Sequence, residues 1–253
     1  MKMTRLTSLI LCLVFMICMF AGCSHSNNAQ VDNKTEHTQK IYPLMKIKTT
    51  YMGETDVYNV GEGFSIGDNG LISEIIHKSE TATFSYDDKG HLVNVNVKNK
   101  NTGKIGYEKW TYNGDLPTDV DYDPNNTRNK RQATIIFTKD ANGNVTETIE
   151  NNTFTDSKGK TTKGTWKHIF TYDANGRVTS GKYYSNNKLD HSFKVTYDAN
   201  GNILVYSGIN PSDNSEYLRV EFTYDTVEKA VTKTATDPFA KFYNFLNALE
   251  YLL

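Results

Sequence analysis

One nine-residue pattern recurs along the middle of this chain and limits what the chain can fold into. Its clearest copy is Phe-Thr-Tyr-Asp-Ala-Asn-Gly-Arg-Val at 170–178, and 195–203 repeats it closely. The aromatic side chains lie two residues apart, so they point to one face of an extended strand, and the Ser or Thr between them points to the other. This alternation predicts antiparallel strands with one face in water. Looser copies lie at 84–92, 110–114, 137–145 and 222–225.

The Asp-Ala-Asn-Gly segment inside each copy has the composition of a tight turn. The Asp carboxylate accepts backbone N–H groups at the first position, and Gly takes the left-handed conformation at the fourth. Each copy therefore predicts a β-hairpin. Asp-x-Asn-Gly also resembles the start of a calcium loop, but no copy supplies the further oxygen ligands and the distal Glu of an EF-hand. We predict turns here, and we predict no metal site and no cofactor.

The spacing of the copies indicates a meander of hairpins. The first position of the motif, which is aromatic in every copy except Val195, falls at 84, 110, 137, 170, 195 and 222, so the period drifts between 25 and 33 residues. A drifting period with a constant motif indicates loops of variable length. We predict an all-β fold over 44–236, an antiparallel meander that forms a strongly curved sheet or an open barrel.

The connections at the far end of the hairpins differ from one another in length and sequence. Recognition usually depends on variable loops held by a rigid scaffold, so we expect a ligand at that end. The alternative is that these connections only link the strands and have no binding role. These connections are 100–103, 123–126, 156–159, 185–188 and 210–214.

Residues 1–22 have the features of a bacterial signal peptide. Two basic residues precede an apolar run over 9–20, and the segment ends in Phe20-Ala21-Gly22-Cys23. Small residues before a Cys resemble the lipoprotein cleavage box, and this resemblance implies that Cys23 becomes the lipid-carrying first residue. The alternatives are cleavage elsewhere or a membrane anchor, although the run is short for a spanning helix of about 20 residues. Ser24 follows Cys23, which by analogy favours the outer membrane and leaves its periplasmic or surface side open.

The segments that flank the repeats are of different kinds. Residues 23–43 are polar and predict a flexible tether, in which His25 and His37 are solvated linker rather than metal ligands. Asp237-Pro238 suits a helix start, and apolar residues then recur every three or four positions. We predict an amphipathic helix over 237–253 that packs on the aromatic concave face of the sheet. A helix that faces a partner or a membrane is the alternative.

The repeated Tyr-Asp-x-x-Gly-x-apolar motif resembles the YD repeats of bacterial Rhs-type proteins over roughly residues 66–225. The whole chain, with its lipoprotein-like start, is similar to a Bacteroidetes lipoprotein family of unknown function that is described as having a porin-like fold. This resemblance implies an architecture and an envelope location, and it implies no activity.

The residues that carry chemistry form no catalytic motif in the sequence. The formal net charge of −1 gives no basic face for nucleic acid. The chain has no Gly-x-Ser-x-Gly elbow, His-Glu-x-x-His or P-loop, so we predict no catalytic residues. Asp119, Asp121 and Asp123 alternate along one strand and form the best acidic cluster, for which a solvated face is the simpler interpretation. His168 shares the aromatic stripe and is interpreted as a core histidine.

These observations predict a lipid-anchored envelope protein, not an enzyme, that binds a ligand or partner. A glycan or another envelope protein is the expected partner class, and exposed Tyr183, Tyr184 or Tyr206 would supply stacking faces. The alternatives are a structural or assembly component of an outer-membrane complex and a glycan-active hydrolase with a site on its loops. The sequence does not identify the ligand.

Overall fold

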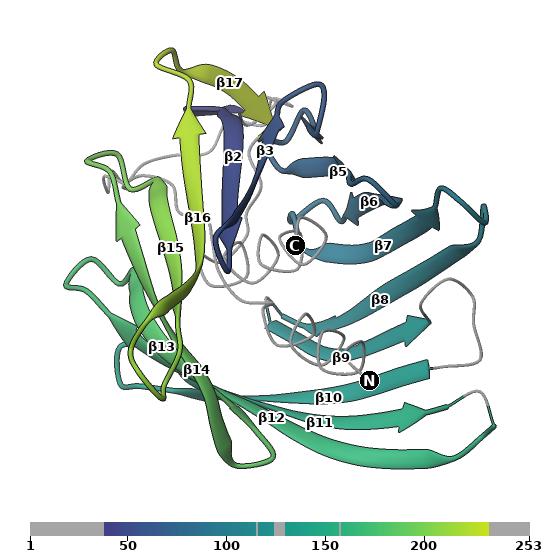
Figure 1. The fold of residues 1–253 in the computed structure, drawn as a ribbon. Helices are drawn as coiled ribbons and strands as arrows, with labels where there is room; N and C mark the ends of the chain where they lie inside the picture. The colour runs from purple at the N-terminus through teal and green to yellow at the C-terminus, as the bar shows by residue number, and fades with distance from the viewer. Residues whose placement is uncertain (1–37, 115, 124–129, 157, 233–253) are drawn as a thin grey trace, which may run out of the picture.

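The computed structural model describes residues 38–114, 116–123, 130–156 and 158–232 (Figure 1). Within these ranges the chain forms strands and their connections and no helix, so it has no helix there that could cross a membrane. The expected signal peptide 1–22, Cys23, most of the tether and the helix over 237–253 lie outside the described residues and stay predictions.

The described residues form 17 strands. In chain order they are β1 (Thr38–Ile41), β2 (Leu44–Tyr51), β3 (Glu54–Asn59), β4 (Phe64–Ile66), β5 (Ile72–Ile76), β6 (Glu80–Tyr86), β7 (Leu92–Asn99), β8 (Ile105–Asn113), β9 (Leu116–Asp123), β10 (Lys130–Lys139), β11 (Val145–Thr155), β12 (Thr161–Tyr172), β13 (Val178–Ser185), β14 (Lys188–Tyr197), β15 (Ile203–Ile209), β16 (Glu216–Tyr224) and β17 (Lys229–Thr232).

Fifteen of the strands form one antiparallel sheet that curves almost into a closed barrel (Figure 1). From β4 to β16 each strand pairs with its neighbours in sequence, which confirms the predicted meander. The sheet continues because β2, near the start of the chain, pairs with β16, with Thr49 opposite Val220. Its two edge strands are β3 and β4, which follow each other in sequence, and one isolated bridge joins Val60, just after β3, to Phe64 in β4. The barrel is therefore complete except at this seam.

The predicted tether over 23–43 is wrong at its C-terminal end. Residues 38–41 form β1, which pairs with β17 in a separate two-stranded ribbon, with Ile41 opposite Lys229. Ile41 is 3% exposed, so this apolar residue is part of the folded domain. A strand of four residues is too short to show a periodic pattern, and its partner lies almost two hundred positions along the chain.

The aromatic alternation of the repeats sets the two faces of the sheet as predicted. The first aromatic residue of the motif points inward and is buried, as in Phe84, Phe170 and Phe222. The Ser or Thr that follows is exposed in every copy. Burying one such ring contributes roughly 1.5–3 kcal/mol, so the inner face supplies most of the hydrophobic stabilisation.

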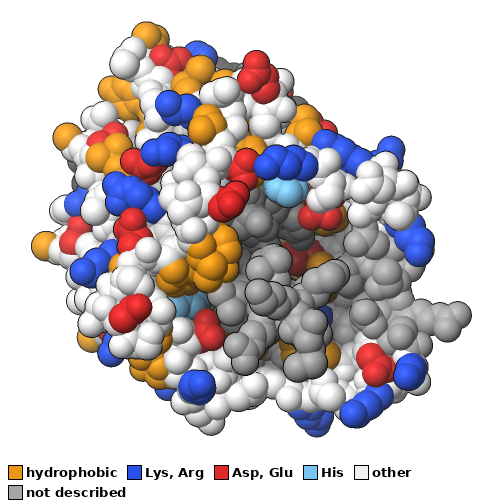
Figure 2. Space-filling view, in the orientation of Figure 1, with side chains coloured by type: hydrophobic (Ala, Val, Ile, Leu, Met, Phe, Trp, Pro, Cys, Tyr) orange, Lys and Arg blue, Asp and Glu red, His pale blue; other side chains and the backbone are white. Residues whose placement is uncertain are grey.

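The outer face of the described strands carries charged side chains of both signs, interspersed over the face that Figure 2 shows. Lys48 pairs with Glu221 at 2.7 Å, and Lys167 pairs with Glu147 at 3.5 Å. Exposed large apolar residues such as Ile105 and Ile136 are scattered among them.

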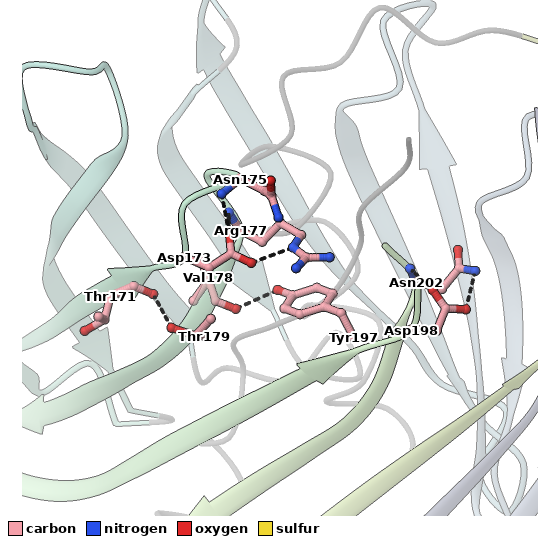
Figure 3. Close-up of polar contacts among 9 residues, drawn as sticks. All are labelled: Thr171, Asp173, Asn175, Arg177, Val178, Thr179, Tyr197, Asp198 and Asn202. Carbon is pink, nitrogen blue, oxygen red and sulfur yellow. Dashed lines mark hydrogen bonds and ion pairs between the residues drawn. The ribbon is translucent and has the colours of Figure 1, made fainter. Parts of the chain in front are cut away.

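The Asp-x-x-Gly turns form as predicted (Figure 3). In the copy at 173–177, Asp173 Oδ1 accepts the backbone N–H groups of Asn175 and Arg177, each at 2.9 Å. Gly176 takes a φ of 74°, and its N–H donates to the Asp173 carbonyl at 3.1 Å. Asp173 Oδ2 pairs with Arg177 Nε at 2.7 Å. Both carboxylate oxygens bind groups of the chain itself, which supports the turn interpretation over a calcium loop.

Candidate functional site

The two ends of the barrel differ in the way the sequence predicts, with one correction. One end carries the repeated Asp-x-x-Gly turns, and we call the opposite end the variable end. Its described connections include Met52–Gly53, 77–79, 100–104, 186–187 and 210–215. The connection that begins at Asp156 belongs to this end but is not irregular. Asp156 Oδ1 accepts the N–H groups of Lys158 and Lys160, so it repeats the turn of the other end.

A pocket of about 280 Å³ opens at the variable end, and we call it the variable-end pocket. Its walls come from the β2–β3 turn, from β14 and from the β15–β16 connection with the start of β16. The lining residues are Met52, Asp190, His191, Asn210, Pro211 and Tyr217. The sequence pointed to the connection at 210–214, but it did not bring these three segments together.

The aromatic wall of the pocket is Tyr217, whose ring is held before any ligand arrives. The ring lies across Gly208, where an added Cβ would come within 2.9 Å of Tyr217 Cζ. The ring meets Tyr51 edge-on at 6.3 Å and His191 edge-on at 6.0 Å between centroids. The backbone N–H of Met52 donates to the Tyr217 carbonyl at 2.9 Å. Met52 itself has a φ of 49° in a tight turn and a side chain that is 66% exposed.

The polar groups of the pocket are also fixed by the chain. Asp190 Oδ2 accepts a hydrogen bond from His191 Nδ1 at 3.0 Å, and the Asp190 side chain stays 37% exposed. Asn210 Oδ1 accepts from the backbone N–H of Ser212 at 3.0 Å and from its Oγ at 2.8 Å. Because Oδ1 is occupied, the amide offers Nδ2 as a donor. The pocket therefore presents a carboxylate acceptor and an amide donor beside an aromatic ring.

His191 also ends a row of side chains that crosses the inner wall. Thr148, His168, Tyr183 and His191 are direct neighbours across β11, β12, β13 and β14. Thr148 Oγ1 lies 3.1 Å from His168 Nδ1, and the ring of Tyr183 lies 4.7 Å from that of His168 and 5.0 Å from that of His191. Burial first, and then the nearby His191, lower the pKa of His168 well below its usual value. His168 is a core histidine, as predicted.

An ion pair lies beside this row on the inner wall, and the sequence analysis missed it. Arg131 Nη2 contacts Glu150 Oε2 at 2.6 Å, Arg131 Nε donates to Asn152 Oδ1 at 2.6 Å, and the guanidinium lies 4.3 Å from the ring centre of Trp166. Glu150 is 3% exposed. A sequence signal for this pair was present in β11. Three successive inward positions of that strand, Thr148, Glu150 and Asn152, are polar, although the inner face is otherwise mostly apolar.

The prediction that three tyrosines are exposed is wrong for two of them. Tyr183 is 1% exposed and Tyr206 is 3% exposed, because both point into the barrel. Burial raises the pKa of Tyr206 well above its ordinary value. Tyr184 alone lies on the outer face and is partly exposed, with Lys167 Nζ 5.1 Å from its ring centre.

The acidic cluster of β9 does not form one site. Asp119 is exposed and accepts from Thr134 Oγ1 at 3.3 Å, and Asp121 accepts from the hydroxyl of Tyr107 at 3.3 Å. Asp123 is 4% exposed, so the prediction of a solvated face is wrong for this residue. In the part of the chain that the structure describes, no group of three or more His, Cys, Asp or Glu is placed to hold a metal ion.

No protein-family model matches this sequence, and no curated protein matches it. Similar solved structures include a porin-like protein from Bacteroides vulgatus, at 13% identity and a TM-score of 0.46, over 74% of this chain and 100% of that one. A porin-like protein from Bacteroides uniformis shares 12% identity at a TM-score of 0.34, over 73% of this chain and 97% of that one. A structure of TcdB2-TccC3-TEV shares 11% identity at a TM-score of 0.29, over 63% of this chain and 10% of that one. Because these TM-scores lie below 0.5, we take neither a family nor an activity from them.

Proposed function

We propose that this chain is a non-enzymatic protein of the bacterial cell envelope, anchored by lipid at Cys23, that binds a ligand at its variable end. The proposed envelope location is supported by the N-terminal sequence, in which a basic start and an apolar run lead to Phe20-Ala21-Gly22-Cys23. The binding role is supported by the variable-end pocket.

The observation that carries the binding role is the fixed geometry of this pocket. An aromatic ring, a carboxylate and an amide converge on one concavity, and each is positioned by contacts within the chain. Pockets of this kind, largely formed before binding and with a few convergent polar groups, are the usual sites for small ligands. Asn210 lies in a connection, and Asp190 and Tyr217 lie near the starts of β14 and β16, so the pocket opens among the loops at one end of a continuous sheet, where recognition is commonly located.

The lining favours binding over hydrolysis. Asp190 is the one carboxylate among the six lining residues, whereas a retaining glycosidase needs two carboxylates about 5 Å apart. The imidazole of His191 is 6% exposed at its side chain, and its Nδ1 is already bonded to Asp190. A general base must reach the proton that it removes, and this imidazole is largely covered.

A thermal-shift screen with polysaccharides, peptides and calcium tests the binding role. A ligand at about 100 times its dissociation constant should add roughly 2.7 kcal/mol of stability. The shift should disappear in Tyr217→Ala and persist in Tyr184→Ala, which removes a tyrosine from the outer face. A shift that survives in Tyr217→Ala would place the ligand elsewhere, and turnover of the ligand would exclude the non-enzymatic role.

Membrane fractionation tests the anchor separately. The full chain should appear in the membrane fraction of a bacterial host and carry labelled fatty acid, and Cys23→Ser should lose both. Ser24→Ala serves as the control because it keeps the cysteine. Fatty-acid labelling that persists in Cys23→Ser would contradict the proposed lipidation site.

A further inference from the structure

We infer that the variable-end pocket binds one uncharged sugar ring, the terminal residue of a glycan. This inference rests on the proposed function, since it names the ligand class of the same pocket. Three properties of the pocket carry it, namely its size, its fixed aromatic wall and the pairing of one acceptor with one donor.

The size of the pocket selects a single ring. Its volume of about 280 Å³ lies just below the roughly 300–1,000 Å³ of pockets that hold drug-sized ligands. A chain of several sugars would extend beyond it, over the exposed connection at 210–215. The pocket therefore fits the end of a glycan, with the rest of the glycan leaving past Pro211.

The aromatic wall suits the apolar face of a sugar ring. A pyranose presents C–H groups on its faces and hydroxyls around its rim, so it stacks on an aromatic ring while its rim forms hydrogen bonds. Tyr217 is backed by Gly208 and braced by Tyr51 and His191, so little side-chain entropy is lost when a ligand stacks on it. Pro211 and the exposed side chain of Met52 add apolar contact.

The polar groups discriminate between ligand classes. A sugar hydroxyl both donates and accepts, so it can donate to Asp190 and accept from Asn210 Nδ2. An organic cation would suit Asp190 and the Tyr217 ring, but it accepts no hydrogen bond and would leave Asn210 Nδ2 without a ligand partner. An acidic sugar would place its carboxylate close to that of Asp190, and the two charges repel. These contacts favour a neutral sugar.

Methionine methyl groups give a direct test. The chain has six methionines, and four of them lie in residues 1–22. Of the other two, Met52 lines the variable-end pocket, and Met45 lines a separate pocket of about 560 Å³ beside β1 and β17. In protein purified from a host that expresses the full chain, ¹³C-methyl signals of Met45 and Met52 are assigned with Met→Leu variants. They are then followed at pH 8 during titration with methyl glucoside, methyl galactoside, methyl mannoside, N-acetylglucosamine, glucuronate and choline.

The expected result is a saturable shift of the Met52 signal with at least one neutral sugar, while the Met45 signal stays in place. Tyr217→Ala should lower the affinity for that sugar at least tenfold, and Tyr184→Ala should leave this affinity unchanged. Glucuronate should leave the Met52 signal of the unaltered chain in place and should move it in Asp190→Asn, which removes the repelling charge. The readout in the unaltered chain does not depend on the folding of any variant.

If no neutral sugar moves the Met52 signal, the inference is overturned. If choline moves that signal instead, the sugar assignment fails while the binding role of the pocket stands. If a neutral sugar moves Met45 and Met52 equally, the interaction is not specific to the pocket, and the inference also falls.

Discussion

The hydroxyl of Tyr197 donates a hydrogen bond of 2.6 Å to the backbone carbonyl of Val178 (Figure 3). Tyr197 precedes the turn of its own repeat, and Val178 follows the turn of the preceding repeat, so the bond joins two hairpins. The same relation recurs for Tyr172 and Val145 at 2.6 Å. It also recurs at 2.9 Å for Tyr112, which donates to Leu92. In these copies the tyrosine of the motif therefore fastens its hairpin to the one before it, a role that Phe cannot fill.

Replacing Tyr197 with Phe should destabilise the protein by about 1 kcal/mol, because the net worth of one hydrogen bond is about 0.5–1.5 kcal/mol. Urea denaturation measures the change. Tyr184→Phe is the control, since this tyrosine lies on the outer face and takes no part in the hairpin bonds. Equal midpoints for Tyr197→Phe and the unaltered chain would show that the bond does not hold the hairpins together.

Local features of the fold were predictable, because each hairpin is specified within about ten residues. The Asp-x-x-Gly turns and the inward aromatic rings follow from turn chemistry and strand alternation. The inward direction of Tyr183 rather than Tyr184 did not follow. The pairing of β12 with β13 shifts register between Thr171 and Tyr172, whose partners are Ser180 and Val178. Alternation counted from the buried Val178 would therefore turn Tyr184 inward instead of Tyr183.

The candidate pocket was beyond sequence analysis for a different reason. Its walls come from Met52, from Asp190 and His191, and from residues 210–217. These segments meet because β2 pairs with β16, a contact between strands more than 160 positions apart, with Thr49 opposite Val220. No repeat or local motif encodes that pairing. The loops at this end were predicted to carry recognition. Which side chains converge there could be identified only once the pairing that curves the sheet was known.

Gly181→Ala should destabilise the fold by roughly 1–3 kcal/mol, the usual range for overpacking a core. Gly181 lies between Phe170 and Phe193 in the sheet, and an added Cβ would overlap the Phe193 ring and come within 2.5 Å of the Ile169 carbonyl. Thermal denaturation measures the effect. Gly164→Ala in β12 is the matched control, because its Cβ would have its nearest neighbour at 3.5 Å and should change stability little. Similar losses in both variants would contradict the packing argument.

Removing one partner of the buried ion pair should be more harmful than removing both. Glu150→Leu leaves the charge of Arg131 buried without its carboxylate and should destabilise the protein by about 3–5 kcal/mol. Arg131→Met combined with Glu150→Leu should destabilise it less. Urea denaturation of the unaltered chain, of Glu150→Leu, of Arg131→Met and of the double variant gives the coupling energy between the two side chains. Asp56→Asn, which breaks an exposed pair with Lys78, should change stability by about 1 kcal/mol or less. If the stability losses of the two single variants add up to the loss of the double variant, the two side chains act independently.

His168 should make the protein less stable in mild acid. Burial, followed by the nearby His191, lowers the pKa of His168 in the folded protein, whereas an unfolded chain has the ordinary value near 6.5. Between these two values the unfolded state binds a proton that the folded state excludes. Stability is therefore full above about pH 6.5 and falls with decreasing pH by up to about 1.4 kcal/mol per pH unit from this group.

Urea denaturation of the unaltered chain and of His168→Gln between pH 8 and pH 5 isolates the contribution of His168. Gln keeps a polar group beside Thr148 but does not titrate. The variant should therefore lose less stability than the unaltered chain over this range, whatever its stability at pH 8. His77→Gln is the control, because His77 lies in a connection at the variable end and is only half-buried. If His168→Gln and the unaltered chain lose stability in parallel, His168 is not the group that senses acid.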